Sequence, residues 1–124
     1  MRQYDSGVEG VIVSRPGEGE RFDRGDRVIM LRAELGQLSV NEIEFDPAFS
    51  VPPHRHEDHV DAFYVLEGEV EFTLESGVVT AGPGTLVAAP PGTLHGFGTR
   101  GPGRARVLNL HAPDSGFAES IRRH

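Results

Sequence analysis

Short runs of strand-forming residues, separated by glycine and proline turns, dominate this sequence. In residues 70–75 apolar and polar side chains alternate, which is the pattern of a half-buried strand. Residues 86–89 and 104–111 form two further apolar runs bounded by turn residues. Because 16 Gly and 9 Pro are spread over 124 residues, long helices are disfavoured. Six or more short strands at regular spacing predict an all-β sandwich or barrel, formed by residues 1–124 as a single domain.

Three segments divide the chain. Residues 1–37 hold candidate strands at 8–13 and 27–33, separated by a charged stretch at 18–27 that is typical of a solvated loop. We expect this segment to supply an edge strand and the contacts of a homodimer. Residues 38–112 form the predicted barrel. In the tail, residues 113–124, Phe117 and Ile121 lie four positions apart and predict a short amphipathic helix.

Two stretches of the predicted barrel suggest local irregularity. In residues 38–45 the apolar positions change phase, from Leu38 and Val40 to Ile43 and Phe45, which predicts a β-bulge or a bend. Residues 96–103 are rich in glycine and are predicted to be a flexible loop.

Composition excludes several classes of function. The chain has no cysteine, so disulfides and thiolate chemistry are excluded, and a metal would need nitrogen and oxygen ligands. The formal net charge of −7 argues against binding nucleic acid, which requires a basic patch. No apolar run approaches the roughly 20 residues that span a bilayer, and the N-terminus lacks a secretory signal, so the cytoplasm is the expected location.

Histidines and acids are concentrated in residues 51–68. Three histidines (His54, His56 and His59) and three acids (Glu57, Asp58 and Asp61) fall within eight positions. On an extended strand His54 and His56 point to the same face, because successive side chains alternate. Two neighbouring imidazoles are half of a divalent-metal site, and a carboxylate with one more distant histidine would complete it.

A second stretch, residues 82–99, contains that histidine, and the two stretches together resemble the cupin family. The first cupin motif, G-x5-H-x-H-x3or4-E-x6-G, is matched by His54, His56, Asp61 and Gly68. The second motif, G-x5-P-x-G-x2-H-x3-N, is matched by residues at the same spacing: Gly84, Pro90, Gly92, His95 and Thr99. Three positions differ from the family pattern: Asp61 replaces glutamate, Thr99 replaces asparagine, and Ala48 replaces the first glycine.

The resemblance implies a small double-sheet β-barrel of the cupin type, ending here in a short C-terminal helix. It also implies that His54, His56, Asp61 and His95 bind one divalent metal ion (Fe, Mn, Ni, Cu or Zn). Asp61 is one methylene shorter than glutamate, so three arrangements stay open. Asp61 binds the metal directly or through water, it supports a three-histidine site, or His59 takes its place. Direct or water-mediated binding by Asp61 is the favoured arrangement.

Alternation along the strands predicts the surroundings of the metal. The side chains expected to line a substrate pocket are Phe63, Val65, Phe97 and Thr99. Asn109 and His111 share one face of the last strand. They face either the cavity, as substrate contacts or a general base, or the solvent, with Leu108 and Leu110 in the core. The outward orientation is slightly favoured. The hydroxyl residues show no Ser–His–Asp spacing.

The expected function is that of a metal-dependent enzyme acting on a small organic molecule. Oxygenase-type chemistry is narrowly favoured over Lewis-acid isomerase or cyclase chemistry, and Asp61 could also serve as a catalytic base. A non-catalytic barrel that binds a small ligand is the alternative.

Overall fold

A computed structural model describes residues 10–124 of the 124-residue chain. The predicted strand at 8–13 begins outside these residues, and within them it is reduced to an isolated bridge at Val13. In this described part of the chain, ten strands precede one short helix. Their bounds are β1 (Glu20–Asp23), β2 (Arg27–Glu34), β3 (Ser39–Phe45), β4 (Ser50–His54), β5 (Val60–Glu67), β6 (Val70–Leu74), β7 (Gly77–Ala81), β8 (Leu86–Ala89), β9 (His95–Thr99), β10 (Ala105–Ala112) and α1 (Phe117–Arg123).

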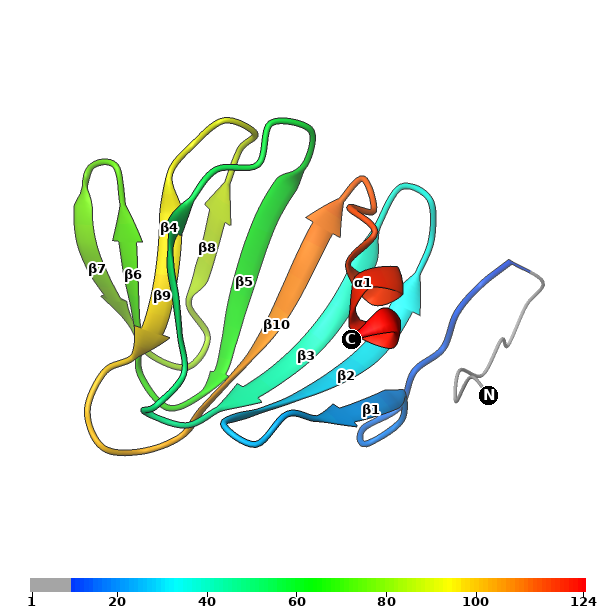
Figure 1. The fold of residues 1–124 in the computed structure, drawn as a ribbon, viewed down its shortest axis with the longest axis horizontal. Helices are drawn as coiled ribbons and strands as arrows, with labels where there is room; N and C mark the ends of the chain where they lie inside the picture. Colours follow the sequence, from blue (N-terminus) through cyan, green and yellow to red (C-terminus); the bar gives the residue numbers. More distant parts are fainter. Residues whose placement is uncertain (1–9) are drawn as a thin grey trace.

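The strands form two antiparallel sheets that face each other. One sheet has six strands in the order β1-β2-β3-β10-β5-β8, and the other has four in the order β4-β9-β6-β7 (Figure 1). Strands that are distant in sequence lie side by side, since β10 pairs with both β3 and β5. The expected all-β, double-sheet fold is therefore confirmed.

A phenylalanine-rich core fills the space between the sheets. The rings of Phe63 and Phe97 lie 5.0 Å apart, and Phe72 lies 5.3 Å from Phe63. Burial of several aromatic side chains makes a large apolar contribution to stability, because each ring removes a large area from water. One region between the sheets holds polar side chains instead, and several histidines lie close together there.

Two segments predicted to be loops are strands. Residues 20–23 form β1, because Phe22 packs against the core and outweighs the charges around it. Among residues 10–124, β1 pairs only with β2, which makes it an edge strand of the described sheet. The homodimer expected to use this edge stays a prediction. Residues 96–99 belong to β9, whose glycines pack between neighbouring strands instead of bending the chain.

The predicted change of phase in residues 38–45 is also wrong for β3 itself. Alternate side chains of β3 are buried without interruption, and the first two of them, Ser39 and Asn41, are polar. At the start of β3, the positions of the apolar residues therefore predicted the wrong face of the strand to be buried. The irregularity lies on the partner strand β2, where the register shifts between Leu31 and Ala33.

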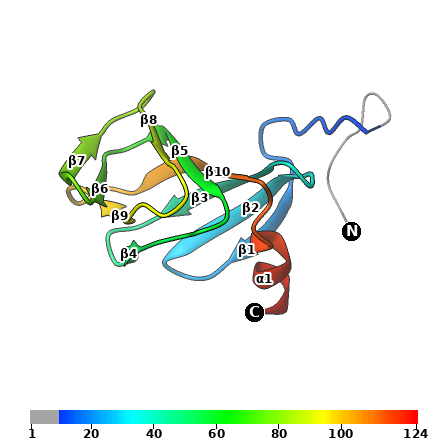
Figure 2. The ribbon, with the colours of Figure 1, turned by 90° about the horizontal axis from the view of Figure 1, so that it is seen from above.

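The helix α1 confirms the amphipathic tail. Phe117 and Ile121 pack against the core, and the helix lies beside β1 and β2 (Figure 2). Arg122 holds it there by pairing with Glu20 at 2.7 Å and Glu34 at 2.5 Å. Arg24 donates a further hydrogen bond to the Ile121 carbonyl oxygen at 2.9 Å.

Replacing Arg122 by alanine is expected to destabilise the protein by about 1 kcal/mol, since the ion pairs are partly exposed and exposed pairs contribute little. Thermal unfolding followed by circular dichroism measures the change. Arg123→Ala, on the same helix, is the control and should leave the unfolding temperature unchanged. Equal effects of the two substitutions would show that the Arg122 ion pairs do not hold the helix.

Candidate metal centre

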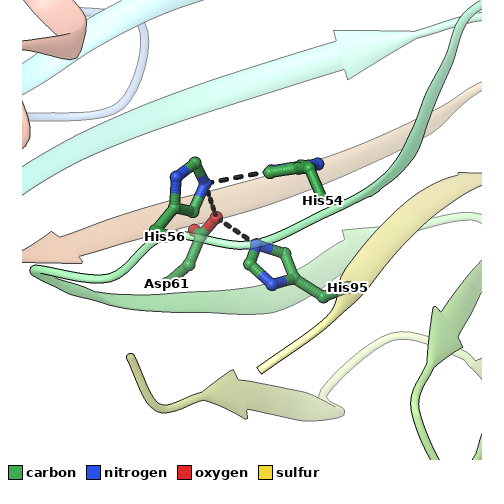
Figure 3. A group of neighbouring side chains, drawn as sticks. All are labelled: His54, His56, Asp61 and His95. Carbon is green, nitrogen blue, oxygen red and sulfur yellow. Dashed lines mark hydrogen bonds and ion pairs between the residues drawn. The ribbon is translucent and has the colours of Figure 1, made fainter. Parts of the chain in front are cut away.

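Four side chains from two distant segments meet at one end of the space between the sheets. His54 ends β4, His56 lies in the loop after it, Asp61 is in β5, and His95 begins β9. His54 and His95 are paired across β4 and β9, which places their rings 4.6 Å apart. Figure 3 shows the four side chains pointing toward a common position (Figure 3). The structure thus brings together the ligand set that the sequence motifs predict.

Gly96 allows β4 and β9 to approach closely enough for these four side chains to converge. A Cβ atom at position 96 would lie 2.7 Å from both the Pro53 nitrogen and the Val51 carbonyl oxygen. Real side chains do not tolerate such contacts, so only glycine lets the β4 backbone pass this close to β9. The glycine next to His95 therefore serves close strand packing.

Hydrogen bonds fix the two histidine-bearing loops to each other. The Gly92 amide donates to the His56 carbonyl oxygen at 2.6 Å, and the Arg55 guanidinium donates to the Gly92 carbonyl oxygen at 3.1 Å. Glu75 accepts from the Leu94 amide at 3.0 Å and from Arg55. These bonds to Leu94 and Arg55 hold the pKa of the Glu75 carboxyl below its usual value. The loops are thereby held in place before any ligand binds.

The four ligand atoms lie within 4.8 Å of one another. His54 Nε2 is 2.9 Å from His56 Nε2, and Asp61 Oδ2 is 2.9 Å from His95 Nε2 and 3.4 Å from His56 Nε2. Three imidazoles and one carboxylate suit Fe, Mn, Ni, Cu or Zn, and they leave further coordination positions for water or substrate. The group is able to hold one metal ion.

The outer ring nitrogens set the histidine tautomers. His54 Nδ1 lies 2.9 Å from the Pro52 carbonyl oxygen, and His95 Nδ1 lies 3.0 Å from the Thr93 carbonyl oxygen. A carbonyl oxygen can only accept, so each Nδ1 carries the proton. A ring with a single proton then turns the Nε2 lone pair toward the centre, as metal-binding histidines do.

This arrangement fits a cation. With its one proton on Nδ1, His95 turns the Nε2 lone pair toward the ionised Oδ2 of Asp61 at 2.9 Å, which is repulsive unless positive charge lies between them. Burial and the neighbouring His59 lower the pKa of His56, which disfavours a proton on that ring as the source of the charge. A divalent ion removes the repulsion and satisfies all four donors.

Asp61 is anchored through its other oxygen. Asn109 Nδ2 donates to Asp61 Oδ1 at 2.6 Å, and His111 Nε2 lies 3.2 Å from the same oxygen. Burial alone would raise the pKa of Asp61, but the hydrogen bond and charge of His111, together with the hydrogen bond from Asn109, outweigh it and lower the pKa. Oδ1 is held by the protein, and Oδ2 is directed at the centre. These contacts support Asp61, despite its shorter side chain, as the carboxylate ligand.

The outward orientation favoured for Asn109 and His111 is wrong. Both are buried, and the partly exposed Leu108 and Leu110 lie on the opposite face of β10. Both faces of β10 carry apolar residues, so its sequence does not identify the inner face. The useful signal lies in the pairing partners, since Asn109 lies opposite Asn41 and His111 opposite Ser39, the polar inner residues of β3.

Ser115, which lines the cavity, places its hydroxyl group next to His111. Ser115 Oγ lies 2.9 Å from His111 Nδ1, so Ser115, His111 and Asp61 form a hydrogen-bonded series. The sequence showed no such series because its members come from β5, β10 and the turn before α1. An ionised carboxylate can only accept, so His111 Nε2 carries a proton toward Asp61, and in the neutral ring Nδ1 accepts from the Ser115 hydroxyl.

His59 lies outside the ligand set. Its ring is 4.3 Å from that of His56, and its Nδ1 is 2.8 Å from an Asp58 carboxylate oxygen. Its Nε2 is buried and has no hydrogen-bond partner among residues 10–124. The structure therefore places His59 beside the centre, and its role as a substitute ligand stays a prediction.

A cavity of about 370 Å³ adjoins the centre and is lined mainly by apolar side chains. Of the predicted pocket residues, Phe63 and Phe97 line this cavity. Val65 is fully buried in the core, and Thr99 lines a smaller pocket bounded by β4, β6 and β9. A largely apolar cavity with a few polar groups at one end is the usual form of a small-molecule site.

A two-sheet barrel with this histidine and aspartate cluster defines the class of protein. The family model of the cupin domain matches residues 41–111, which is more than half of the chain. The chain belongs to the cupin family.

Two curated relatives match much of this chain but only a smaller part of their own length. The chain is 30% identical over 97 residues to quercetin 2,3-dioxygenase of Bacillus subtilis, a match that covers 75% of this chain and 28% of the relative. It is 32% identical over 84 residues to germin-like protein subfamily T member 3 of Arabidopsis thaliana, covering 62% and 36%. The matches thus span about a third of the length of these relatives.

Solved structures resemble the whole barrel. KdgF from a Halomonas species superposes with a TM-score of 0.75 at 26% identity, over 85% of this chain and 97% of that protein. An RmlC-like cupin from Shewanella frigidimarina gives a TM-score of 0.75 at 21% identity, over 91% and 96%. Among the described residues, no helix is long and apolar enough to cross a membrane.

Proposed function

We propose that this cupin is a metal-dependent enzyme that acts on a small organic molecule, with oxygenase-type chemistry. The observation that carries the proposal is the position of the His54, His56, Asp61 and His95 cluster at one end of a largely apolar cavity. Similarity to quercetin 2,3-dioxygenase over 75% of the chain supports the choice of reaction class.

The four ligands would hold one divalent ion at the polar end of the cavity. When bound, Fe, Mn, Ni or Cu would supply redox chemistry with dioxygen, and Zn would supply Lewis acidity for an isomerisation or cyclisation. The phenylalanine walls would exclude water and orient the apolar part of the substrate. Phe63 and Phe97 are suited to this role, since both line the cavity and the Phe63 ring lies 6.3 Å from that of His95.

Asp61 would act first as a ligand. Its lowered pKa keeps the carboxylate ionised, and Asn109 with His111 occupies Oδ1, so Oδ2 is the oxygen available to a metal or to a substrate proton. A carboxylate with a low pKa is a weak base, and proton transfer to Oδ2 would therefore be the lesser of its two roles.

Metal content separates the proposed classes of function. Elemental analysis of the full chain, purified without added metal and after reconstitution, should find about one Fe, Mn, Ni or Cu ion per chain. Dioxygen consumption with catechol-type and flavonol substrates should then depend on that ion. One zinc ion per chain without dioxygen consumption would instead support an isomerase or cyclase, and no metal after reconstitution would support a non-catalytic binding protein.

A further inference from the structure

We propose that the ligand of this cavity is an elongated aromatic or apolar molecule that ends in a carboxylate, and that Arg27 binds this carboxylate. The inference deepens the proposed function by naming the substrate class, and it rests on that proposal in placing the other end of the ligand at the metal centre.

Arg27 lines the same cavity as the candidate ligands but lies far from them along the sheet. It begins β2 and pairs with Phe45 of β3, which in turn pairs with Ala105 at the start of β10. The metal centre lies at the other end of β10, where His111 pairs with Asp61. Figure 1 shows the start of β2 and the end of β10 at opposite ends of the six-stranded sheet (Figure 1).

The length of β10 gives the scale of the separation. Six residue steps lead from Ala105 to His111, which is roughly 20 Å of extended strand. The side chains of Arg27 and Asp61 reach inward and shorten the gap, but a small compact ligand would not touch both ends. A ligand that contacts both ends is therefore elongated.

Apolar side chains line the cavity between these ends. Ile29 and Ile43 come from the six-stranded sheet, Phe49 and Phe97 face them, and Phe117 comes from α1. Such a lining offers few hydrogen bonds to a sugar or a peptide and favours an aromatic or aliphatic body.

The Arg27 guanidinium is held in position for an anion. It lies 4.9 Å from the centre of the Phe49 ring, a cation–π contact that restricts its orientation. Its ion-pair partner is Asp26 at 3.0 Å, and about a third of each side chain is exposed. An exposed ion pair is weak, so a ligand carboxylate can replace Asp26. Arg27 is the one arginine among the described residues that line the cavity.

Two matched probes test this assignment on the zinc-loaded full chain by isothermal titration calorimetry. The probes are 4′-hydroxybiphenyl-4-carboxylate and the neutral 4′-hydroxybiphenyl-4-carboxamide, which have the same shape. We expect the carboxylate to bind about fivefold to tenfold more tightly, as a partly exposed charged hydrogen bond allows. The preference should weaken as salt is added, because the pair is solvent-accessible.

Four variants test which residue causes the tighter binding of the carboxylate probe. Arg27→Gln should abolish it, and Arg27→Lys should keep only part of it, because an ammonium lacks the bidentate fork. Asp26→Asn should strengthen binding of the carboxylate, because it removes the competing anion. Arg104→Gln is the control: it removes an equal charge from an exposed ion pair with Glu44. Arg104 does not line the cavity, so this substitution should leave the preference unchanged.

Metal content, measured on every variant, keeps the two proposals separate. Equal affinities for the two probes, no binding of either probe, or a preference that survives in Arg27→Gln would overturn the anion assignment while a normal metal content upholds the metal centre. Conversely, a carboxylate preference lost only in the Arg27 variants of a chain that takes up no metal would uphold the anion assignment and refute the metal-dependent function.

Discussion

Replacing His95 by alanine is expected to lower the affinity for Zn²⁺ or Fe²⁺ by more than about 100-fold, since even residues that only support metal ligands contribute 10- to 100-fold. His95 is 2% exposed and is the ligand contributed by the second motif. Its tautomer is fixed by the Thr93 carbonyl oxygen, so its Nε2 is already directed at the centre. No side chain from β9 can take its place, because Gly96 follows directly and Phe97 is apolar. Competition with a chromophoric chelator measures the affinity.

Two further variants decide between Asp61 and His59. Asp61→Ala should also lower the metal affinity strongly, and His59→Ala should leave it within a few fold, because only Asp61 belongs to the group of converging ligand atoms. His59→Ala is a suitable control, since it removes a buried imidazole 4.3 Å from the ring of His56. Full metal content in Asp61→Ala together with loss of metal in His59→Ala would refute the ligand set.

The four candidate ligands were predicted from two spaced motifs that resemble those of the cupin family. His54 and His56 share a side of the chain by alternation, and His95 follows a proline–glycine turn that fixes where β9 begins. The strand boundaries of β2 and β8 followed from apolar runs ending at glycine or proline. In each of these cases the prediction needed only a short stretch of sequence, although the pairing of β4 with β9 is what brings His54 and His95 together.

The residues that support Asp61 could not be predicted in the same way. Asn109 and His111 point inward because β10 lies between β3 and β5, and the inner positions of β3 at that level are Ser39 and Asn41. Strand order and register decide this, and neither is visible in the sequence of β10. The polar inner face also explains why alternation failed at the start of β3, where hydrophobicity indicated the opposite face.

Support from a neighbouring strand also explains how the short side chain of Asp61 can face the centre. Side-chain length alone suggests that aspartate falls short of a metal site built for glutamate. The structure shows that the carboxylate is oriented by two donors on Oδ1, so that Oδ2 lies 2.9 Å from His95 Nε2. Whether a carboxylate can serve as a ligand therefore depends on what holds its second oxygen, and here that support comes from the neighbouring strand.

Removing this support should weaken metal binding even though every ligand stays in place. Asn109→Leu keeps the volume of the side chain and removes the amide that donates to Asp61 Oδ1 at 2.6 Å. His111→Phe does the same for the imidazole at 3.2 Å. We expect each substitution to lower the metal affinity by about 10- to 100-fold, the usual effect of losing a residue that orients a ligand.

Leu110→Ala is the matched control, because Leu110 lies on the opposite face of the same strand and its loss should lower stability without changing the metal affinity. Chelator competition gives the affinity of each variant, and thermal unfolding of the metal-free protein shows which variants are merely less stable. If Asn109→Leu and His111→Phe bind metal as the unmodified protein does, Asp61 is not held by these donors in the metal-bound state. The carboxylate must then reach the centre by a movement of β5, for which the hydrogen bonds to Oδ1 are dispensable.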